Sequence, residues 1–159
     1  MTEAWEPDPP SATPELASLR PLIVVVNTSA KTLRRIEALL SHEGYLVSTV
    51  SSFATARELL RSVRPDLVIA DVQLGAFNGL HLAMQSRTQG VSVIVTHHEE
   101  DTAFEREAAR FGAVFVADPL GNPTFLTKVH ALLSNRTGRT MRIRQWPRKR
   151  TLSGLPAQL

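Results

Sequence analysis

Five short apolar runs recur along the chain, and each is followed by a segment in which apolar residues repeat with the period of a helix. The apolar runs are 22–27, 45–50, 66–71, 91–96 and 113–118. Runs that are apolar on both faces and rich in β-branched residues are typical of parallel strands covered by helices on both sides. The pattern therefore predicts an α/β fold, a doubly wound five-stranded parallel sheet built from a strand–helix unit repeated five times.

Polar residues mark where several of the helices should begin. Asn78 is predicted to cap a short third helix, and the helix after the fourth apolar run is predicted to begin at Glu100. The last helix is predicted to open with Asn122 as its cap and Pro123 as its first residue. Its core-facing residues are predicted to be Leu126, Val129 and Leu133.

Charge and proline content divide the chain into three parts. Residues 1–20 are rich in proline and acid and are predicted to form a disordered arm, whereas residues 21–134 carry the strand–helix pattern. Residues 135–159 form a basic tail, because seven of the 18 Lys and Arg residues lie beyond position 135 and no acid does. The rest of the chain has eleven Lys and Arg against fifteen Asp and Glu, so only the tail offers a strongly basic surface.

Cysteine content and hydropathy indicate the cellular compartment in which the protein is expected. The chain has no cysteine, which excludes a disulfide scaffold and thiolate metal sites and is compatible with a reducing compartment. The first twenty residues lack the basic start and apolar core of a secretory signal. No apolar run approaches the ~20 residues that span a bilayer. We therefore expect a cytoplasmic protein.

Polar residues at the ends of the predicted strands are the first candidates for a functional site. In doubly wound sheets, ligands bind beyond the carboxyl ends of the strands, near the point where the strand order reverses. The residues that fall there are Asn27, Thr28, Asp71, Thr96 and Asp118. Asp71 is notable because it ends a run that is otherwise apolar on both faces.

Three segments resemble the receiver domain of bacterial two-component response regulators over roughly residues 21–134. They are "PDLVIADVQLGAFNGLHL" around Asp71, "VIVTHH" around Thr96 and "FGAVFVADPLG" around Phe115. The resemblance implies the flavodoxin-like receiver fold, with Asp71 at the phosphoacceptor position and Thr96 at the hydroxyl that contacts the phosphoryl group. It also places Phe115 at the switch aromatic, although a plain core aromatic is an equally good interpretation.

The sequence departs from this family where the family's chemistry depends on charge. Asn27 and Thr28 stand where the family has the acidic pair that holds Mg²⁺, and Asp118 stands where it has a lysine. His97 follows Thr96 at a position that the family usually keeps small. Phosphoryl transfer to a carboxylate needs cations to offset the developing negative charge. We therefore expect a degenerate site, no cofactor, doubtful Mg²⁺ binding, and a signalling module rather than an enzyme.

Two other interpretations of these residues stay open. Asp71 could still accept a phosphoryl group through an altered metal site that includes Asp118, or could simply be the polar end of a buried strand. The run from His97 to Glu100 could hold a metal ion, but four consecutive polar residues after a strand more often form a solvated loop.

The basic tail suggests an anionic ligand. Arg144 and Arg148 form an Arg-x-x-x-Arg pair that weakly resembles the opening of a PilZ domain, which implies cyclic-di-GMP as a ligand. Trp146 among the arginines would also suit nucleic acid. A solvated linker to an effector domain is the simpler interpretation. For protein partners or a homodimer, the resemblance implies the face formed by residues 99–134.

Overall fold

The structure is a computed structural model that describes residues 20–135. Nearly all of the predicted arm and of the basic tail, including Arg144 and Arg148, lies outside the described residues. Within residues 20–135, no helix is long and apolar enough to cross a membrane.

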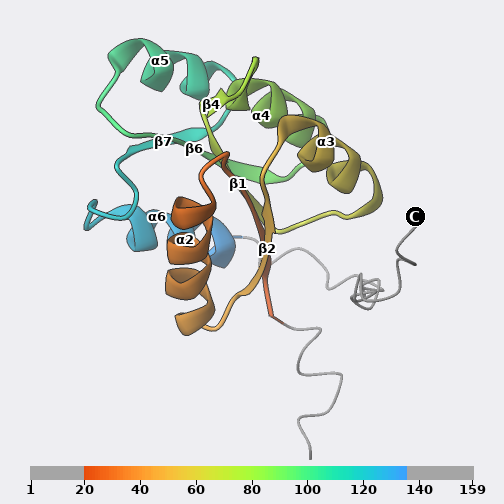
Figure 1. The fold of residues 1–159 in the computed structure, drawn as a ribbon, viewed down its shortest axis with the longest axis vertical. Helices are drawn as coiled ribbons and strands as arrows, with labels where there is room; N and C mark the ends of the chain where they lie inside the picture. Colours follow the sequence, from red (N-terminus) through yellow and green to blue (C-terminus); the bar gives the residue numbers. More distant parts are fainter. Residues whose placement is uncertain (1–19, 136–159) are drawn as a thin grey trace, which may run out of the picture. The chain divides into compact units, whose positions relative to one another are not determined.

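The described residues form the predicted doubly wound sheet, with five parallel strands in the order β2-β1-β3-β6-β7 (Figure 1). These strands are β1 (Leu22–Val26), β2 (Leu46–Val50), β3 (Leu67–Asp71), β6 (Ser92–His97) and β7 (Val114–Ala117). The chain leaves β1 to build β2 on one side and then returns to build β3 on the other. The strand order therefore reverses between β1 and β3, and this is where such folds place their ligands.

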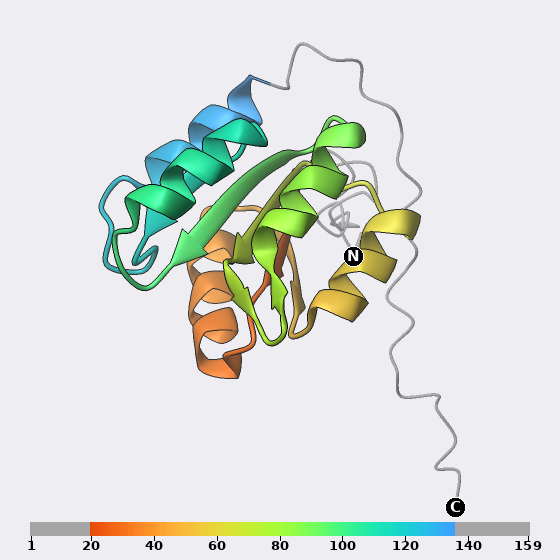
Figure 2. The same cartoon turned by 90° about the horizontal axis from the view of Figure 1, so that it is seen from above.

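Five helices cover the two faces of the sheet. They are α2 (Ala30–His42), α3 (Phe53–Ser62), α4 (Gly79–Thr88), α5 (Thr102–Arg110) and α6 (Phe125–Ser134). Helices α3, α4 and α5 lie on one face, and α2 and α6 lie on the other (Figures 1 and 2). Each face has its own buried apolar cluster, which explains why the strands are apolar on both sides. The predicted fold class is confirmed.

Two predicted helix starts are two residues too early, and in each case a polar side chain binds backbone ahead of the helix. The helix predicted to begin at Glu100 begins at Thr102, because Asp101 Oδ1 accepts hydrogen bonds from the backbone N–H groups of Ala103 and Phe104 at 2.9 and 3.1 Å. Side chains that cap a helix lie outside it, so the last acidic residue of the run fixes where the helix begins. The Asn78 cap is confirmed, since its Oδ1 accepts from Leu80 N at 2.8 Å.

The last helix begins at Phe125 rather than Pro123, and the predicted Asn122 cap is wrong, because the N-cap residue is Thr124 and its side chain makes no capping hydrogen bond. Asn122 Oδ1 accepts from Thr124 N at 2.9 Å and from its hydroxyl at 2.7 Å, which closes a turn that contains Pro123 ahead of the helix. As a result Phe125 takes a fully buried core position that the sequence did not predict, while Leu126 is only partly buried. Val129 and Leu133 are buried as predicted.

A two-stranded hairpin, formed by β4 (Gln73–Leu74) and β5 (Phe77–Asn78), follows β3 and was not predicted. Its turn includes Gly75 at φ +65°, a conformation that glycine adopts without strain. Figure 2 shows the hairpin beside the start of α4, at the carboxyl edge of the sheet. Gly79 follows it and packs so closely on β3 that an added Cβ would lie 2.1 Å from the carbonyl oxygen of Asp71.

Candidate functional site

Asp71 is the last residue of β3, a central strand, and it lies at the carboxyl edge where the strand order reverses. Parallel register places it beside Thr96 on β6, and Asn27 follows directly after β1 on the other side. Thr96 is 2% exposed and Asn27 is 8% exposed, whereas Asp71 is half-buried. The structure thus brings together three of the five residues predicted for the site.

The carboxylate of Asp71 is held by three neutral donors. Its Oδ2 accepts from Asn27 Nδ2 at 3.4 Å and from Thr96 Oγ1 at 3.5 Å. Its Oδ1 accepts a shorter bond, 2.8 Å, from the backbone N–H of Gln73 at the start of the hairpin. The Gln73 contact was not predicted, because a backbone donor two residues along leaves no trace in residue type.

Burial raises the pKa of the Asp71 carboxyl above its ordinary value. The Gln73 N–H, the nearby imidazole of His97, the Thr96 hydroxyl and His98 oppose this shift but do not cancel it. Asp118, the carboxylate at the position of the family's lysine, is not among the groups that shift this pKa. Among the described residues, desolvation is what raises this pKa.

Asn27 has two roles at the edge. Its Oδ1 accepts from the backbone N–H of Ser29 at 2.8 Å, which shapes the turn into α2, and its Nδ2 faces Asp71. The amide oxygen is therefore engaged in its own turn, and the group offered to Asp71 is a donor. The neighbouring Thr28 side chain is exposed. This pair gives the site no second carboxylate with which to hold a hard cation.

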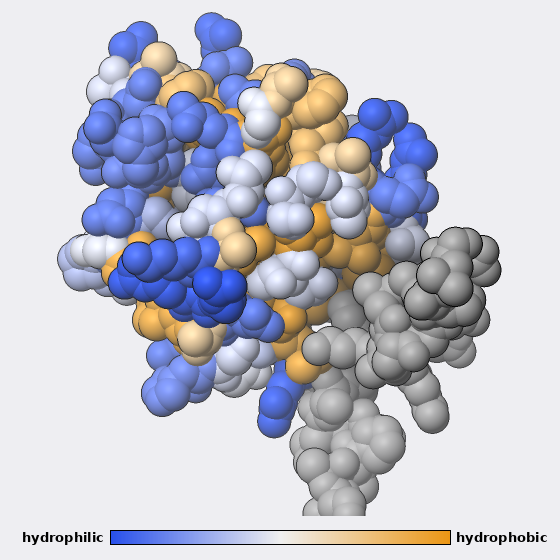
Figure 3. Space-filling view, in the orientation of Figure 1, coloured by the Kyte–Doolittle hydropathy of each residue, from blue (hydrophilic) through white to orange (hydrophobic). Residues whose placement is uncertain are grey.

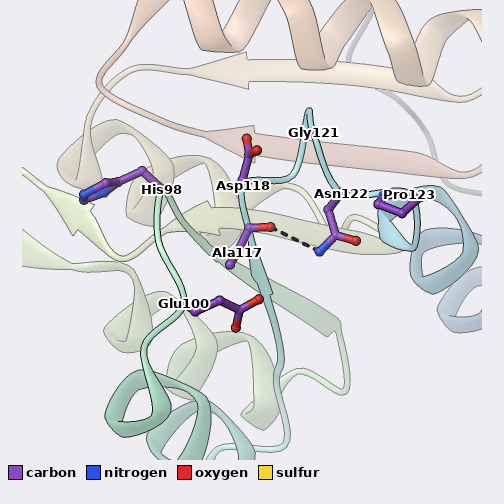
Figure 4. Close-up of a pocket in the computed structure, with 7 residues that line it drawn as sticks. All are labelled: His98, Glu100, Ala117, Asp118, Gly121, Asn122 and Pro123. Atoms are coloured by element: carbon purple, nitrogen blue, oxygen red, sulfur yellow. Dashed lines mark hydrogen bonds between the residues drawn. The ribbon is translucent and has the colours of Figure 1, made fainter.

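Asp118 follows β7 with an exposed side chain and an unusual backbone conformation for a residue other than glycine, φ +41°. Its N–H donates to His97 O at 2.7 Å, and its carbonyl accepts from Gly121 N at 3.0 Å. The residue lines an open pocket of about 330 Å³ between the loops after β6 and β7 (Figure 4). The other lining residues are His98, Glu100, Ala117, Gly121, Asn122 and Pro123.

His97 and Phe115 fill the layer under α5. His97 is 7% exposed, and its ring lies edge-on to His98 and Phe104 at centroid distances of 4.1 and 5.3 Å. Its Nδ1 has no hydrogen-bond partner in the part of the chain that the structure describes. Phe115 is 9% exposed and belongs to the same apolar cluster, so it occupies an inward, core position.

The structure gives no support to a metal site in the His97–Glu100 run. His98 and Glu99 are exposed and pair with each other at 3.6 Å, while His97 is turned into the core. Within residues 20–135, no group of three or more His, Asp or Glu side chains is arranged to hold a metal ion.

The fold is that of a two-component signalling domain. The chain belongs to the response regulator receiver domain family, whose family model matches residues 23–129. Among curated relatives, the alginate biosynthesis transcriptional regulatory protein AlgB of Pseudomonas aeruginosa is 36% identical over 96 residues. That match covers 58% of this chain and 21% of AlgB, so the chain spans only about a fifth of that relative.

Solved structures share the fold at low sequence identity. A two-component response regulator from Clostridium difficile superposes with a TM-score of 0.68 at 16% identity, covering 74% of this chain and 99% of that one. The beryllofluoride-activated NtrC4 receiver domain dimer gives 0.66 at 19% identity, covering 72% and 97%. At these identities the likeness shows the receiver fold alone.

Proposed function

We propose that this chain is an atypical receiver domain that signals through protein contacts, without phosphoryl transfer to Asp71, and has no catalytic activity of its own. The observation that carries the proposal is the set of neutral donors around the Asp71 carboxylate. Asn27, Thr96 and the Gln73 N–H hold the two carboxylate oxygens. None of them offsets the charge that gathers when a carboxylate attacks a phosphoryl group.

The residues that bind Mg²⁺ in the family, and the family's lysine, are replaced here, and the positions of the replacing side chains also disfavour a cation next to Asp71. A divalent cation prefers carboxylate oxygens, but the side chain that follows β1, Asn27, presents its amide nitrogen to Asp71. A lysine beyond β7 would add positive charge, but Asp118 stands at that position, exposed and facing its own pocket. Mg²⁺ binding and acyl phosphate formation are both disfavoured by this arrangement.

A titration with Mg²⁺ and beryllofluoride, followed by NMR of the Asp71 region, tests the proposal. The parent chain should show no saturable shift of the Gln73 and Thr96 amides. The variant Asn27→Asp, Thr28→Asp, Asp118→Lys, which restores the family's charges, is the positive control and should show one. A saturable response in the parent would contradict the proposal, as would loss of cellular signalling in a folded Asp71→Asn variant.

One observation favours the second candidate, a phosphoacceptor with altered metal chemistry. Thr96 Oγ1 lies 3.5 Å from Asp71 Oδ2, in the register where the family's hydroxyl contacts the phosphoryl group. On this hypothesis, the parent would respond to beryllofluoride with Mg²⁺, and Thr96→Val would remove the response.

The proposed output surface is the face formed by residues 99–134. It includes α5, where Arg106 and Arg110 are exposed, and α6, where Lys128 is half-buried. The solved NtrC4 receiver domain is a dimer, and we infer that this chain also pairs with a second copy or a protein partner there. Anion binding by Arg144 and Arg148 in the tail stays a prediction.

Charge reversal tests this surface. The variant Arg106→Glu, Arg110→Glu, Lys128→Glu should weaken association, measured by light scattering, without changing the circular dichroism spectrum. The matched control reverses three exposed cations on α2: Lys31, Arg34 and Arg35. If the control weakens association and the first variant does not, α2 is the contact surface and the proposed face is wrong.

A further inference from the structure

A compact aromatic surface lies where the hairpin meets α3 and α4, on residues that the candidate site does not use. It consists of Phe53, Phe77, His81 and Met84, with Arg57 beside them, and is called the aromatic surface below. Phe77 is 53% exposed and Met84 is 49% exposed, and they are the exposed large hydrophobic residues of the described part of the chain. Figure 3 shows apolar surface gathered in this region.

The aromatic surface is held in place by its neighbours. The Phe77 ring stacks on Phe53 with centroids 4.6 Å apart and an interplanar angle of 12°, and His81 lies edge-on to Phe53 at 6.2 Å. Two glutamine side chains of the α4 region bind backbone carbonyls of α3: Gln85 at 3.5 Å and Gln89 at 3.2 Å. Aromatic side chains held in this way lose little conformational entropy on binding, as at protein interaction hot spots.

The segments that carry the aromatic surface have a net positive charge. Residues 53–62 and 73–88 hold three arginines and one glutamate, and that Glu58 pairs with Arg61 at 3.5 Å. Arg57 lies one helical turn after Phe53, and no ion pair of its guanidinium is found within the described residues. An acidic ligand would meet a cation next to the exposed rings.

We propose that the aromatic surface binds a short acidic segment of a partner protein that carries an apolar anchor residue. A second copy of this chain fits less well. The two half-exposed side chains offer on the order of 200 Å² of apolar area, far below the ~800 Å² per partner of a stable interface. The acidic run of residues 99–101 ahead of α5 cannot supply the anchor either, because Phe104, the large apolar residue that follows it, packs on the core.

The aromatic surface also connects to the candidate site. The hairpin that carries Phe77 begins at Gln73, whose N–H binds Asp71 Oδ1 at 2.8 Å. A segment that binds Phe77 therefore contacts the same hairpin whose Gln73 backbone N–H makes the shortest hydrogen bond to Asp71. Partner binding at the aromatic surface could therefore affect Asp71 through the hairpin, without using the face formed by residues 99–134.

NMR titration of the full chain with synthetic peptides tests the proposal. The probe is a peptide of about ten residues, Asp and Glu throughout except for a central Leu-Trp. It should shift the amides of Phe77, Met84, Arg57 and Gln73 saturably. Two control peptides, one with Lys in place of the acids and one with Ala-Ala in place of Leu-Trp, should bind about tenfold more weakly or not at all.

Variants of the chain complete the experiment. Phe77→Ser and Arg57→Glu should each weaken probe binding about tenfold, whereas Arg34→Glu on α2 should not. Met84→Gln is a second apolar variant if Phe77→Ser perturbs the fold. Absence of saturable shifts, equal binding of the Lys peptide, or binding of phosphatidylglycerol vesicles but not the probe would overturn the proposal. None of these outcomes changes the charge-reversal result for residues 99–134, so the two proposals fail separately.

Discussion

Replacement of Gly79 by alanine should destabilise the domain and disturb the site around Asp71 at the same time. An added Cβ would lie 2.1 Å from the carbonyl oxygen of Asp71 and 2.9 Å from its carbonyl carbon, and Cβ atoms essentially never approach non-bonded heavy atoms of other residues closer than 3.0 Å. The clash is with backbone at the end of a central strand, so neither partner can move away by rotating a side chain.

The cost follows from what must shift. Separating α4 from β3 lengthens the hydrogen bond from Gly79 N to Val72 O, now 3.0 Å, which contributes about 1 kcal/mol. It also strains the Asn78 cap on Leu80 N, worth about 1 kcal/mol, and overpacking adds about 1–3 kcal/mol. Alanine returns about 0.4–1 kcal/mol by restricting the unfolded chain. We expect a net loss of roughly 2–5 kcal/mol.

Urea unfolding followed by circular dichroism measures this loss, and Gly121→Ala is the matched control. Its added Cβ would lie 2.2 Å from Asp118 Oδ2, as close as at Gly79, but that atom is the end of an exposed side chain that can rotate away. The control should therefore lose less than about 0.5 kcal/mol. If the two variants lose equal stability, or Gly79→Ala loses almost none, the argument from backbone contact is wrong.

Three further predictions test the core and two pKa shifts. Phe125→Ala should lower the free energy of unfolding by about 3–5 kcal/mol and Leu126→Ala by clearly less, because only Phe125 is fully buried; equal losses in urea unfolding would contradict this. Because burial raises the pKa of Asp71, the native state binds its proton more tightly, and stability should fall as pH rises from about 4 through the native pKa. Asp71→Asn should then be more stable than the parent at neutral pH but not in acid; the reverse order in urea unfolding would refute it. Burial and Glu43 raise the pKa of Tyr45, the single tyrosine, so Glu43→Gln should lower that pKa partway in an ultraviolet absorbance titration.

The fold was predictable because its signals are local and repeated. Buried parallel strands flanked by helices leave long apolar runs, and the structure confirms all five, within one residue at each end. The hairpin was missed because each of its strands has two residues, too few for an alternating pattern. The helix starts near Glu100 and Pro123 were placed too early, because both Asp101 and Asn122 bind backbone beyond the expected first residue.

The composition of the site was predictable, but its contacts were only partly so. Parallel register puts the ends of β1, β3 and β6 side by side, so Asn27, Asp71 and Thr96 could be grouped from the sequence. Which atom of Asn27 faces Asp71 depends on the turn into α2, and the direction of the Asp118 side chain depends on a φ of +41°. Such torsions depend on tertiary packing and are not specified by residue type.

The three departures from the family's residues around Asp71 can be understood together as a change in charge balance. The receiver family sets an acidic pair and the phosphoacceptor against a lysine and Mg²⁺, so that carboxylates and cations offset one another. In this chain, neutral Asn27 and Thr28 replace the acidic pair, so two negative charges are absent. Asp118 replaces the lysine and lines an open pocket. Asp71 is then a half-buried carboxylate with neutral donors, and its raised pKa already reflects the cost of burying one charge. An aspartate at position 27 could still accept the hydrogen bond from Ser29 N. It would, however, replace the Asn27 donor with a second negative charge that repels Asp71, and a bound cation would be needed to offset that repulsion. The neutral residue at position 27 therefore agrees with the proposed signalling role through surface contacts, in which Asp71 holds no divalent cation.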